Sequence, residues 1–162
     1  MHNDDQRIHG RPGHLIRRLQ QISLALFMDE TKGFDITPVQ YSAMLAIQIH
    51  PGIDQAALCN IIAFDKSTIG DVVGRLERKK LIKRTPGSKD RRAKLLYITS
   101  SGRKLIEEIE PAVEATQKRI LEPLTAKQRK ALMQMLERLV HINNELGRAP
   151  LRTKNRAQSA QR

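Results

Sequence analysis

The sequence predicts a mainly α-helical chain with one small β-hairpin near its middle. Toward both ends, apolar residues recur at alternating spacings of three and four, which is the pattern of one helix face. In the middle, two short apolar runs surround a charged turn, which is the pattern of a hairpin. The 162 residues correspond to about one domain, at the usual ~100–200 residues per domain.

The net charge of +12 is concentrated in particular stretches of the chain. Residues 66–94 contain eleven basic and three acidic side chains, and residues 148–162 contain five basic and no acidic ones. A local positive block of this kind is typical of a protein that contacts the phosphate backbone of nucleic acid. Aromatic residues make up only 3% of the chain, which argues against a surface that stacks single-stranded bases.

Several classes of function are not expected. One cysteine excludes an intrachain disulfide, and no apolar run approaches the ~18 residues that span a bilayer, so we expect a cytoplasmic protein without membrane contact. The five histidines lack metal-ligand spacing, and we find no Gly-rich phosphate loop or nucleophile elbow. We therefore expect no metal, no cofactor and no enzymatic activity. Cys59 is expected to be a buried inert thiol, with redox sensing as the alternative.

The sequence of the N-terminal part of the chain predicts a flexible arm followed by one long helix. Residues 1–11 are polar and show no periodicity. Pro12 stands where proline is tolerated at the start of a helix, and Gly33 ends the helical pattern. Residues 12–36 are assigned to this first helical segment, whose apolar face consists of Leu15, Leu19, Ile22 and Leu26.

Residues 37–104 predict three helices followed by the hairpin. A capping box between Thr37 and Gln40 begins the first of these helices. Asp54 and Asp65 can cap two further helices, and only a few residues separate these two, as in a helix-turn-helix joint. Two strand-like runs then surround a charged tip.

The C-terminal part of the chain predicts two helices and a tail. Thr99 can cap a long helix, in which Pro111 is expected to produce a bend or a break. A second capping box, between Thr125 and Gln128, begins the last helix, which is expected to end at Gly147. These helices are assigned to residues 105–147. Residues 148–162 are basic and polar and are expected to be disordered.

This order of elements defines a winged helix-turn-helix, in which a helix pair, a further helix and a charged hairpin follow one another. The helical segments 12–36 and 105–147 have apolar faces but no core of their own. We therefore expect them to be dimerisation helices that pack against a second copy of the chain.

Short motifs within residues 37–105 point to one family. They are Ser67-Thr68-Ile69, the run from Arg75 to Arg84, Asp90-Arg91-Arg92-Ala93-Lys94, and Thr99 followed by Gly102. Together with the helix order, these motifs resemble the MarR family of bacterial transcriptional regulators. The resemblance implies a homodimer on a double-stranded DNA operator. Each subunit then places its fourth helix in the major groove and its wing in the adjacent minor groove.

The fourth helix departs from the family pattern at Gly70 and Asp71, where a polar residue and an arginine are common. Gly70 and Gly74 each cost about 1 kcal/mol of helix propensity relative to alanine. Either the backbone approaches DNA closely at this position, or the helix packs closely within its own subunit.

The hairpin tip is one candidate for DNA contact. Asp90 can hold the guanidinium of Arg91 or Arg92 in place by hydrogen bonds. A narrow minor groove attracts an inserted arginine. The family resemblance implies that Arg92 takes the deeper position in the groove, with Arg91 beside it. A purely solvated charged tip is the alternative. Lys89 and Lys94 flank these residues on the two sides of the tip.

The start of the fourth helix is the other candidate. Lys66, Ser67 and Thr68 lie at a helix N-terminus, where backbone N–H groups and the helix dipole favour phosphate, with plain capping as the alternative. Arg75 can reach phosphate or pair with Asp71. The complete predicted DNA-binding set is Lys66, Ser67, Thr68, Gly70, Arg75, Lys89, Asp90, Arg91, Arg92 and Lys94.

The first helix carries a polar face opposite its leucines, formed by His14, Arg17, Arg18 and Gln21. A solvated helix face explains this pattern by itself. The family resemblance implies more, because small aromatic acids often bind between the dimerisation helices and the DNA-binding lobe, and arginine is the natural carboxylate partner. The run from Gly10 to Leu19 also looks like members that repress aromatic-acid or nicotinate catabolism.

These observations predict a dimeric repressor that a small aromatic carboxylate releases from a palindromic operator. The alternative is an architectural DNA-binding protein that has no effector and depends on its basic tail. Operator footprinting separates the two, since a repressor protects a short palindrome and an architectural protein covers DNA broadly.

Overall fold

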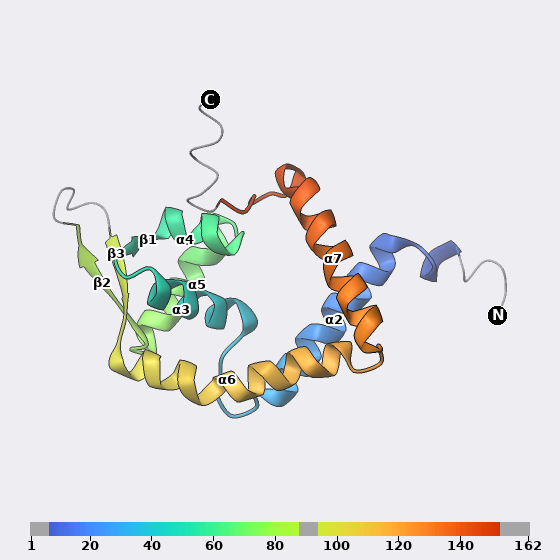
Figure 1. Cartoon of the computed structure of the whole chain (residues 1–162). Coiled ribbons are helices and arrows are strands. Elements are labelled where there is room, and N and C mark those ends of the chain that lie inside the picture. The colour runs from blue at the N-terminus through green and yellow to red at the C-terminus, as the bar shows by residue number, and fades with distance from the viewer. Residues whose placement is uncertain (1–6, 88–93, 153–162) are drawn as a thin grey trace.

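A computed structural model describes residues 7–87 and 94–152 of the chain. The described chain is mainly helical with one small sheet, as the sequence predicts (Figure 1). The long helices are α2 (Pro12–Glu30), α3 (Pro38–Ile49), α4 (Gln55–Ile62), α5 (Lys66–Arg78), α6 (Ser100–Leu121) and α7 (Ala126–Ile142). A short 3-10 helix, Asn144–Leu146, follows α7. None of the helices within the described ranges combines the length and the apolar character that crossing a membrane requires.

Three antiparallel strands, β1 (Ile53–Asp54), β2 (Ile82–Pro86) and β3 (Lys94–Ile98), form a sheet in the order β1-β3-β2. β2 and β3 pair from Ile82 opposite Ile98 to Pro86 opposite Lys94, so the predicted hairpin is present. β1 pairs with β3 and is not predicted by the sequence, because two residues are too few to show an alternating pattern.

Side-chain caps begin five of the described helices at the predicted positions. The capping boxes of Thr37 with Gln40 and of Thr125 with Gln128 are both complete. The other three caps are Asp54, Asp65 and Thr99. α2 begins instead with Pro12 at its first position, and Arg11 before it makes no side-chain cap.

Of the two alternatives expected at Pro111, a bend or a break, the break is absent, since α6 continues through this exposed residue and water can satisfy the carbonyl that loses its backbone partner. Two segments differ from the sequence-based expectation. Residues 7–9, within the predicted arm, form a helical turn. Residues 148–152, within the predicted disordered tail, are held by hydrogen bonds after α7 ends at Ile142.

The buried core belongs to one lobe of the chain, which consists of α3, α4, α5, the sheet and the part of α6 that packs on them. The largest fully buried side chains come from α3, α4, α5, the sheet and α6, and they include Met44, Ile47, Leu58, Ile69, Leu76, Ile82, Leu96 and Ile109. α2 buries only Phe27, and no residue of α7 is buried. The end helices therefore contribute little to the core of a single subunit.

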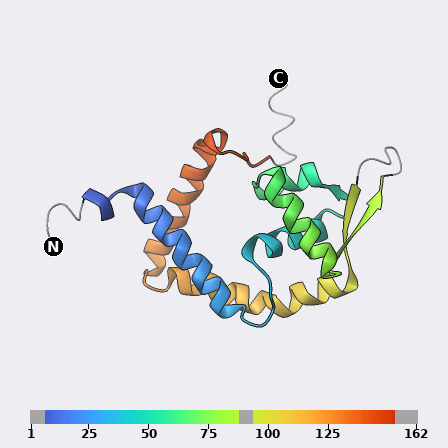
Figure 2. The same cartoon turned by 180° about the vertical axis from the view of Figure 1, so that it is seen from behind.

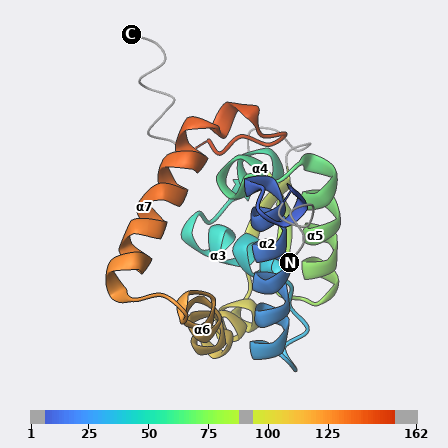
Figure 3. The same ribbon diagram turned by 90° about the vertical axis from the view of Figure 1, so that its right-hand side faces the viewer.

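α6 connects the lobe to these end helices. Figure 2 shows α6 extending from the hairpin to the base of α7, and Figure 3 shows α2 and α7 in front of the lobe, on the side away from the hairpin. The Arg119 guanidinium on α6 bonds the carboxylates of Asp29 and Glu30 at the end of α2, at 2.7 Å each. The Tyr41 hydroxyl on α3 donates a short hydrogen bond to Glu110 on α6. α2 and α3 are thus both tied to α6.

The first turn of α6 lies directly against the start of β2. The Thr99 hydroxyl donates to the Leu81 carbonyl at 2.9 Å and accepts from the Gly102 N–H at 3.0 Å. A Cβ on Gly102 would lie 2.2 Å from the Leu81 carbonyl oxygen and 2.6 Å from Cδ1 of Ile98. Because the first of these atoms is backbone, only glycine fits without a shift of the strand.

We therefore expect Gly102→Ala to lower the free energy of unfolding by about 1–3 kcal/mol, the usual range for overpacking. Urea denaturation measures this change. Gly13→Ala is the control, because a Cβ at Gly13 in α2 meets nothing within 4 Å. That variant should be unchanged or stabilised by up to about 1 kcal/mol through helix propensity. Equal stabilities of the two variants would contradict the close approach.

Candidate nucleic-acid interface and adjoining cavity

The N-terminus of α5 is built around the Asp65 carboxylate. It accepts hydrogen bonds from the Thr68 N–H at 2.8 Å, the Ser67 hydroxyl at 2.6 Å and the Thr68 hydroxyl at 2.7 Å. These hydrogen bonds, led by the one from Ser67, hold the pKa of Asp65 well below its usual range. Asp65 is therefore ionised at neutral pH and remains a cap.

This cap determines which of the predicted residues have hydrogen-bond donors free for DNA phosphates. Ser67 and Thr68 each have one hydroxyl hydrogen, and in the structure both point to Asp65 rather than outward. Phosphate oxygens need donors, so these hydroxyls contact phosphate only if they leave the cap. Lys66 is exposed and precedes both residues. Its ammonium can therefore donate hydrogen bonds to a phosphate at this helix end without disturbing the cap.

Gly70 lies against the neighbouring helix α4. A Cβ on Gly70 would lie 3.5 Å from Nε2 of Gln55, which is ordinary van der Waals contact. Gln55 also donates to the Lys66 carbonyl at 3.5 Å. A Cβ would therefore fit here, so packing against α4 does not require glycine, and the contact of Gly70 with DNA stays a prediction.

The hairpin is attached to α5 by an ion pair. Nε of Arg84 on β2 lies 3.0 Å from a carboxylate oxygen of Glu77 on α5. Lys94 is exposed at the start of β3. The predicted tip residues Lys89, Asp90, Arg91 and Arg92 lie outside the described residues.

A cavity of about 570 Å³ lies between α2, α3 and α5. Arg75 lines it together with Asp71, and no ion pair between these two is found within the described chain. Most of the wall is apolar, with a few polar groups: Gln20, Ser23, Leu24, Thr37, Pro38, Val39, Gln40, Phe64, Thr68, Asp71, Val72 and Arg75. The sequence did not predict this lining, since it combines three helices whose relative placement no local pattern shows.

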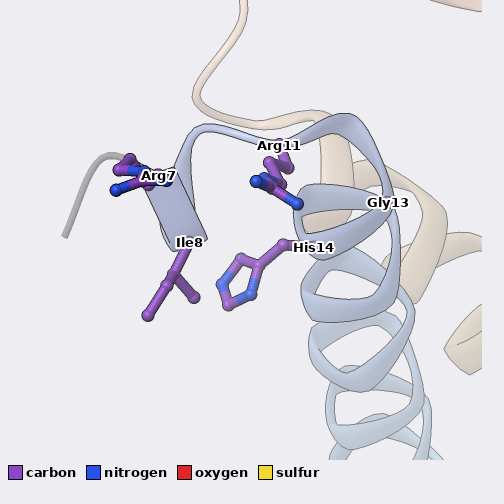
Figure 4. A pocket seen from close by; sticks show the side chains of 5 residues that line it. All are labelled: Arg7, Ile8, Arg11, Gly13 and His14. Carbon is purple, nitrogen blue, oxygen red and sulfur yellow. The ribbon is translucent and has the colours of Figure 1, made fainter. Parts of the chain in front are cut away.

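The four predicted effector residues do not line this cavity. His14 lines a separate, open pocket of about 690 Å³ with Arg7, Ile8, Arg11 and Gly13, and Figure 4 shows its ring facing Ile8. Partial burial and the nearby charge of Arg17 lower the pKa of His14. Arg18 donates to Gln21 at 3.1 Å. Arg17 is exposed and lies three residues before Gln20, which lines the 570 Å³ cavity.

Cys59 is buried in α4 and makes no disulfide. Its burial raises the pKa of the thiol, which disfavours the reactive thiolate. Within residues 7–87 and 94–152, no group of three or more His, Cys, Asp or Glu side chains could hold a metal ion.

Comparisons with known proteins agree with this arrangement. A model of the MarR family matches residues 34–93. The PcaV transcriptional regulator of Streptomyces coelicolor, solved in complex with its natural ligand, shares 30% identity and covers 87% of this chain and 98% of its own, with a TM-score of 0.77. The chain belongs to the MarR family. It is a DNA-binding transcriptional regulator, and α4, α5 and the β2–β3 hairpin are its winged helix-turn-helix.

Two further structures of MarR-type regulators are similar over most of their length. BpsR of Bordetella bronchiseptica, whose DNA binding is regulated by 6-hydroxynicotinic acid, shares 27% identity over 81% of this chain and 94% of its own, with a TM-score of 0.77. The transcriptional repressor CouR, solved on a 23-mer DNA duplex, shares 25% identity over 81% of this chain and 93% of its own, with a TM-score of 0.75.

The cap at α5 predicts different effects for neighbouring residues. Lys66→Ala should reduce the slope of log affinity against log salt by about one for each phosphate that its ammonium neutralises. Ser67→Ala should leave this slope unchanged, because a hydroxyl carries no charge, and should change the affinity little, because its hydroxyl hydrogen is taken by Asp65. Titration of operator DNA at several salt concentrations measures both.

Lys104→Ala is the matched control, since Lys104 lies on α6, away from α5, and pairs with Glu108. It should leave the salt slope unchanged. An unchanged slope for Lys66→Ala as well would show that this helix end does not contact phosphate.

Proposed function

We propose that two copies of this chain form a repressor that binds a palindromic operator and is released by a small aromatic carboxylate. The observation that carries the proposal is the position of the cavity. It has α2, a dimerisation helix, on one side and α5, the recognition helix, on the other. A ligand there contacts both parts of the protein whose relative position decides DNA binding.

Dimerisation is supported by the apolar surfaces of the end helices. On α2, Leu15 is 55% exposed and Ile22 is 46% exposed, and on α7, Leu139 is 54% and Val140 is 64% exposed. Exposed apolar residues that follow one another along two helices indicate an interface rather than isolated surface side chains. A second copy of the chain covers them with the same helices, in a two-fold arrangement.

A two-fold dimer presents two recognition helices to DNA. Such dimers read half-sites about 34–36 Å apart, one turn of the duplex, so the operator is expected to be a palindrome. CouR, a similar protein, is a repressor seen on a DNA duplex. We extend both properties, repression and duplex binding, to this chain.

The effector site is supported by the size and lining of the cavity. Its volume of about 570 Å³ lies within the roughly 300–1,000 Å³ of small-molecule sites. Leu24, Val39 and Phe64 offer apolar contact to a ring, and Arg75 offers a guanidinium to a carboxylate. BpsR, which responds to 6-hydroxynicotinic acid, shows that a similar protein takes a ligand of this chemical class.

Arg17 is the member of the predicted effector set that fits this cavity best. It precedes Gln20 by three residues and Leu24 by seven, so it shares the face of α2 that forms the cavity wall. Arg18 lies on the adjacent face and is engaged by Gln21. We therefore assign the carboxylate to Arg17 and Arg75.

Release from DNA requires that the effector prefer the shape of the dimer that does not fit the operator. A ligand that binds both shapes equally releases nothing, however tightly it binds. A tenfold loss of operator affinity needs about 1.4 kcal/mol of coupling, within the common range of about 1–3 kcal/mol.

The homodimer is tested by hydrodynamic mass. Sedimentation at micromolar concentration should give twice the 18.4 kDa chain. Leu139→Lys should shift the protein toward the monomer and weaken operator binding at least about tenfold, because it places a charge in the interface. Gln134→Lys adds the same charge on the polar face of α7 and should change neither property. A wild-type monomer that binds the operator with full affinity would overturn the proposal.

The effector is tested with a panel of hydroxybenzoates, hydroxycinnamates and hydroxynicotinates in an operator-release assay. At least one should dissociate the complex. Arg17→Ala should raise the concentration needed for half release by about tenfold or more, since a charged hydrogen bond contributes about 1.5–3 kcal/mol.

Arg18→Ala is the matched control and should respond like the wild type, with unchanged DNA affinity for both variants in the absence of ligand. A normal response of Arg17→Ala would place the effector elsewhere. If no aromatic acid acts and the footprint extends broadly along DNA, the architectural alternative replaces this proposal.

A further inference from the structure

Two arginine side chains converge on the surface of α5 at Gly74. A Cβ built on Gly74 would lie 3.5 Å from Nη1 of Arg78 and 3.9 Å from Nη2 of Arg84. Arg78 is the last residue of α5, four residues after Gly74, and Arg84 lies on β2. Because glycine has no side chain, the two guanidiniums lie over bare helix backbone.

The arginine pair lies where α5 and the hairpin meet. Figure 2 shows α5, in green, and β2, in yellow-green, diverging from the junction that follows Arg78. Nε of Arg84 lies 3.0 Å from a carboxylate oxygen of Glu77 on α5. This ion pair holds the Arg84 guanidinium beside the helix, with its Nη2 near Gly74.

The convergence places two positive charges beside one negative charge. Glu77 pairs with Arg84, whereas Arg78 forms no ion pair with any residue in the part of the chain that the structure describes. Lys79, the next residue, is instead engaged, since its ammonium lies 2.8 Å from the Asp35 carboxylate. Like charges repel at short distance, so an anion that bonds both guanidiniums is favoured between them.

The phosphodiester of DNA is the anion that fits this place. Guanidinium groups bind phosphate oxygens through paired N–H donors. α5 is the recognition helix, and a helix of roughly 10–12 Å diameter fills a major groove about 12 Å wide. A phosphate backbone therefore passes along each side of such a helix, and the side of α5 next to β2 meets one of the two.

We propose that Arg78 and Arg84 clamp one phosphate of the operator backbone over Gly74, on the side of α5 next to the hairpin. The inference rests on the proposed function and adds a backbone contact to it. None of these three residues belongs to the DNA-binding set that the sequence predicts. The clamp does not read bases, but it fixes how α5 is seated in the groove, as phosphate contacts do.

The first test replaces single operator phosphates by neutral methylphosphonates. The wild type should lose about tenfold or more in affinity when the clamped phosphate is replaced, because a charged hydrogen-bonded contact is lost. Arg78→Gln should bind the unmodified operator about tenfold more weakly and lose little more from that one replacement. Its salt slope should fall by about two in a dimer, at roughly 0.9 for each phosphate.

Lys104→Gln is the matched control, since it removes the same charge from α6, where Lys104 pairs with Glu108. Its affinity should match that of the wild type on every duplex.

The second test supplies the anion from the protein itself. Gly74→Glu places a carboxylate four residues before Arg78 and beside Arg84, in the place assigned to the phosphate. Helix propensity and the new ion pairs should keep the melting temperature at or above that of the wild type. Operator binding should nevertheless weaken at least about tenfold. Gln134→Glu adds the same charge on the polar face of α7 and should bind as the wild type does.

Equal methylphosphonate profiles for the wild type and Arg78→Gln would overturn the inference. A Gly74→Glu variant that binds the operator with full affinity, or that melts well below the wild type, would also overturn it. An Arg78→Gln loss that depends on the identity of one base pair would assign Arg78 to base reading instead of the clamp. Failure of the wild type to bind the operator duplex would contradict the proposed function, so the two failures are distinguishable.

Discussion

The close contact between Gly102 and the Leu81 carbonyl is the constraint on which the rest of the subunit depends. It joins the hairpin to the start of α6, and α6 then runs without interruption to the base of α7. α2 is fixed to the same helix through Arg119, and α3 through Tyr41. The orientation of the hairpin relative to α2 and α7 is consequently set at one junction, and α6 carries it across the molecule.

The cavity lies between α2 and α5, beyond the contacts that tie α2 to α6. α2 meets α6 near the end that carries Asp29 and Glu30, while its N-terminal half has largely exposed side chains. Opposite that half lies α5, which is fixed to the lobe by buried Ile69, Val73 and Leu76. A ligand in the cavity would contact both helices.

Much of the fold follows from local sequence. Cap residues such as Thr37, Asp65 and Thr125 act on their own first turns, so their helix starts are readable without tertiary information. The exposed apolar faces of α2 and α7 also follow from periodicity. β1 and the ordered residues 148–152 do not, since each depends on a partner distant in sequence, Leu96 for Ile53 and Asn60 for Arg152. The polar face of α2 likewise follows from periodicity, whereas the cavity between α2, α3 and α5 depends on how the three helices are placed in space.

The Asp65 cap places opposite charges side by side at the start of α5. The Asp65 carboxylate stays negative, while the neighbouring Lys66 side chain is exposed and positive. A phosphate that approaches this helix end therefore meets attraction from one group and repulsion from the other, and the position of the ammonium decides the net effect.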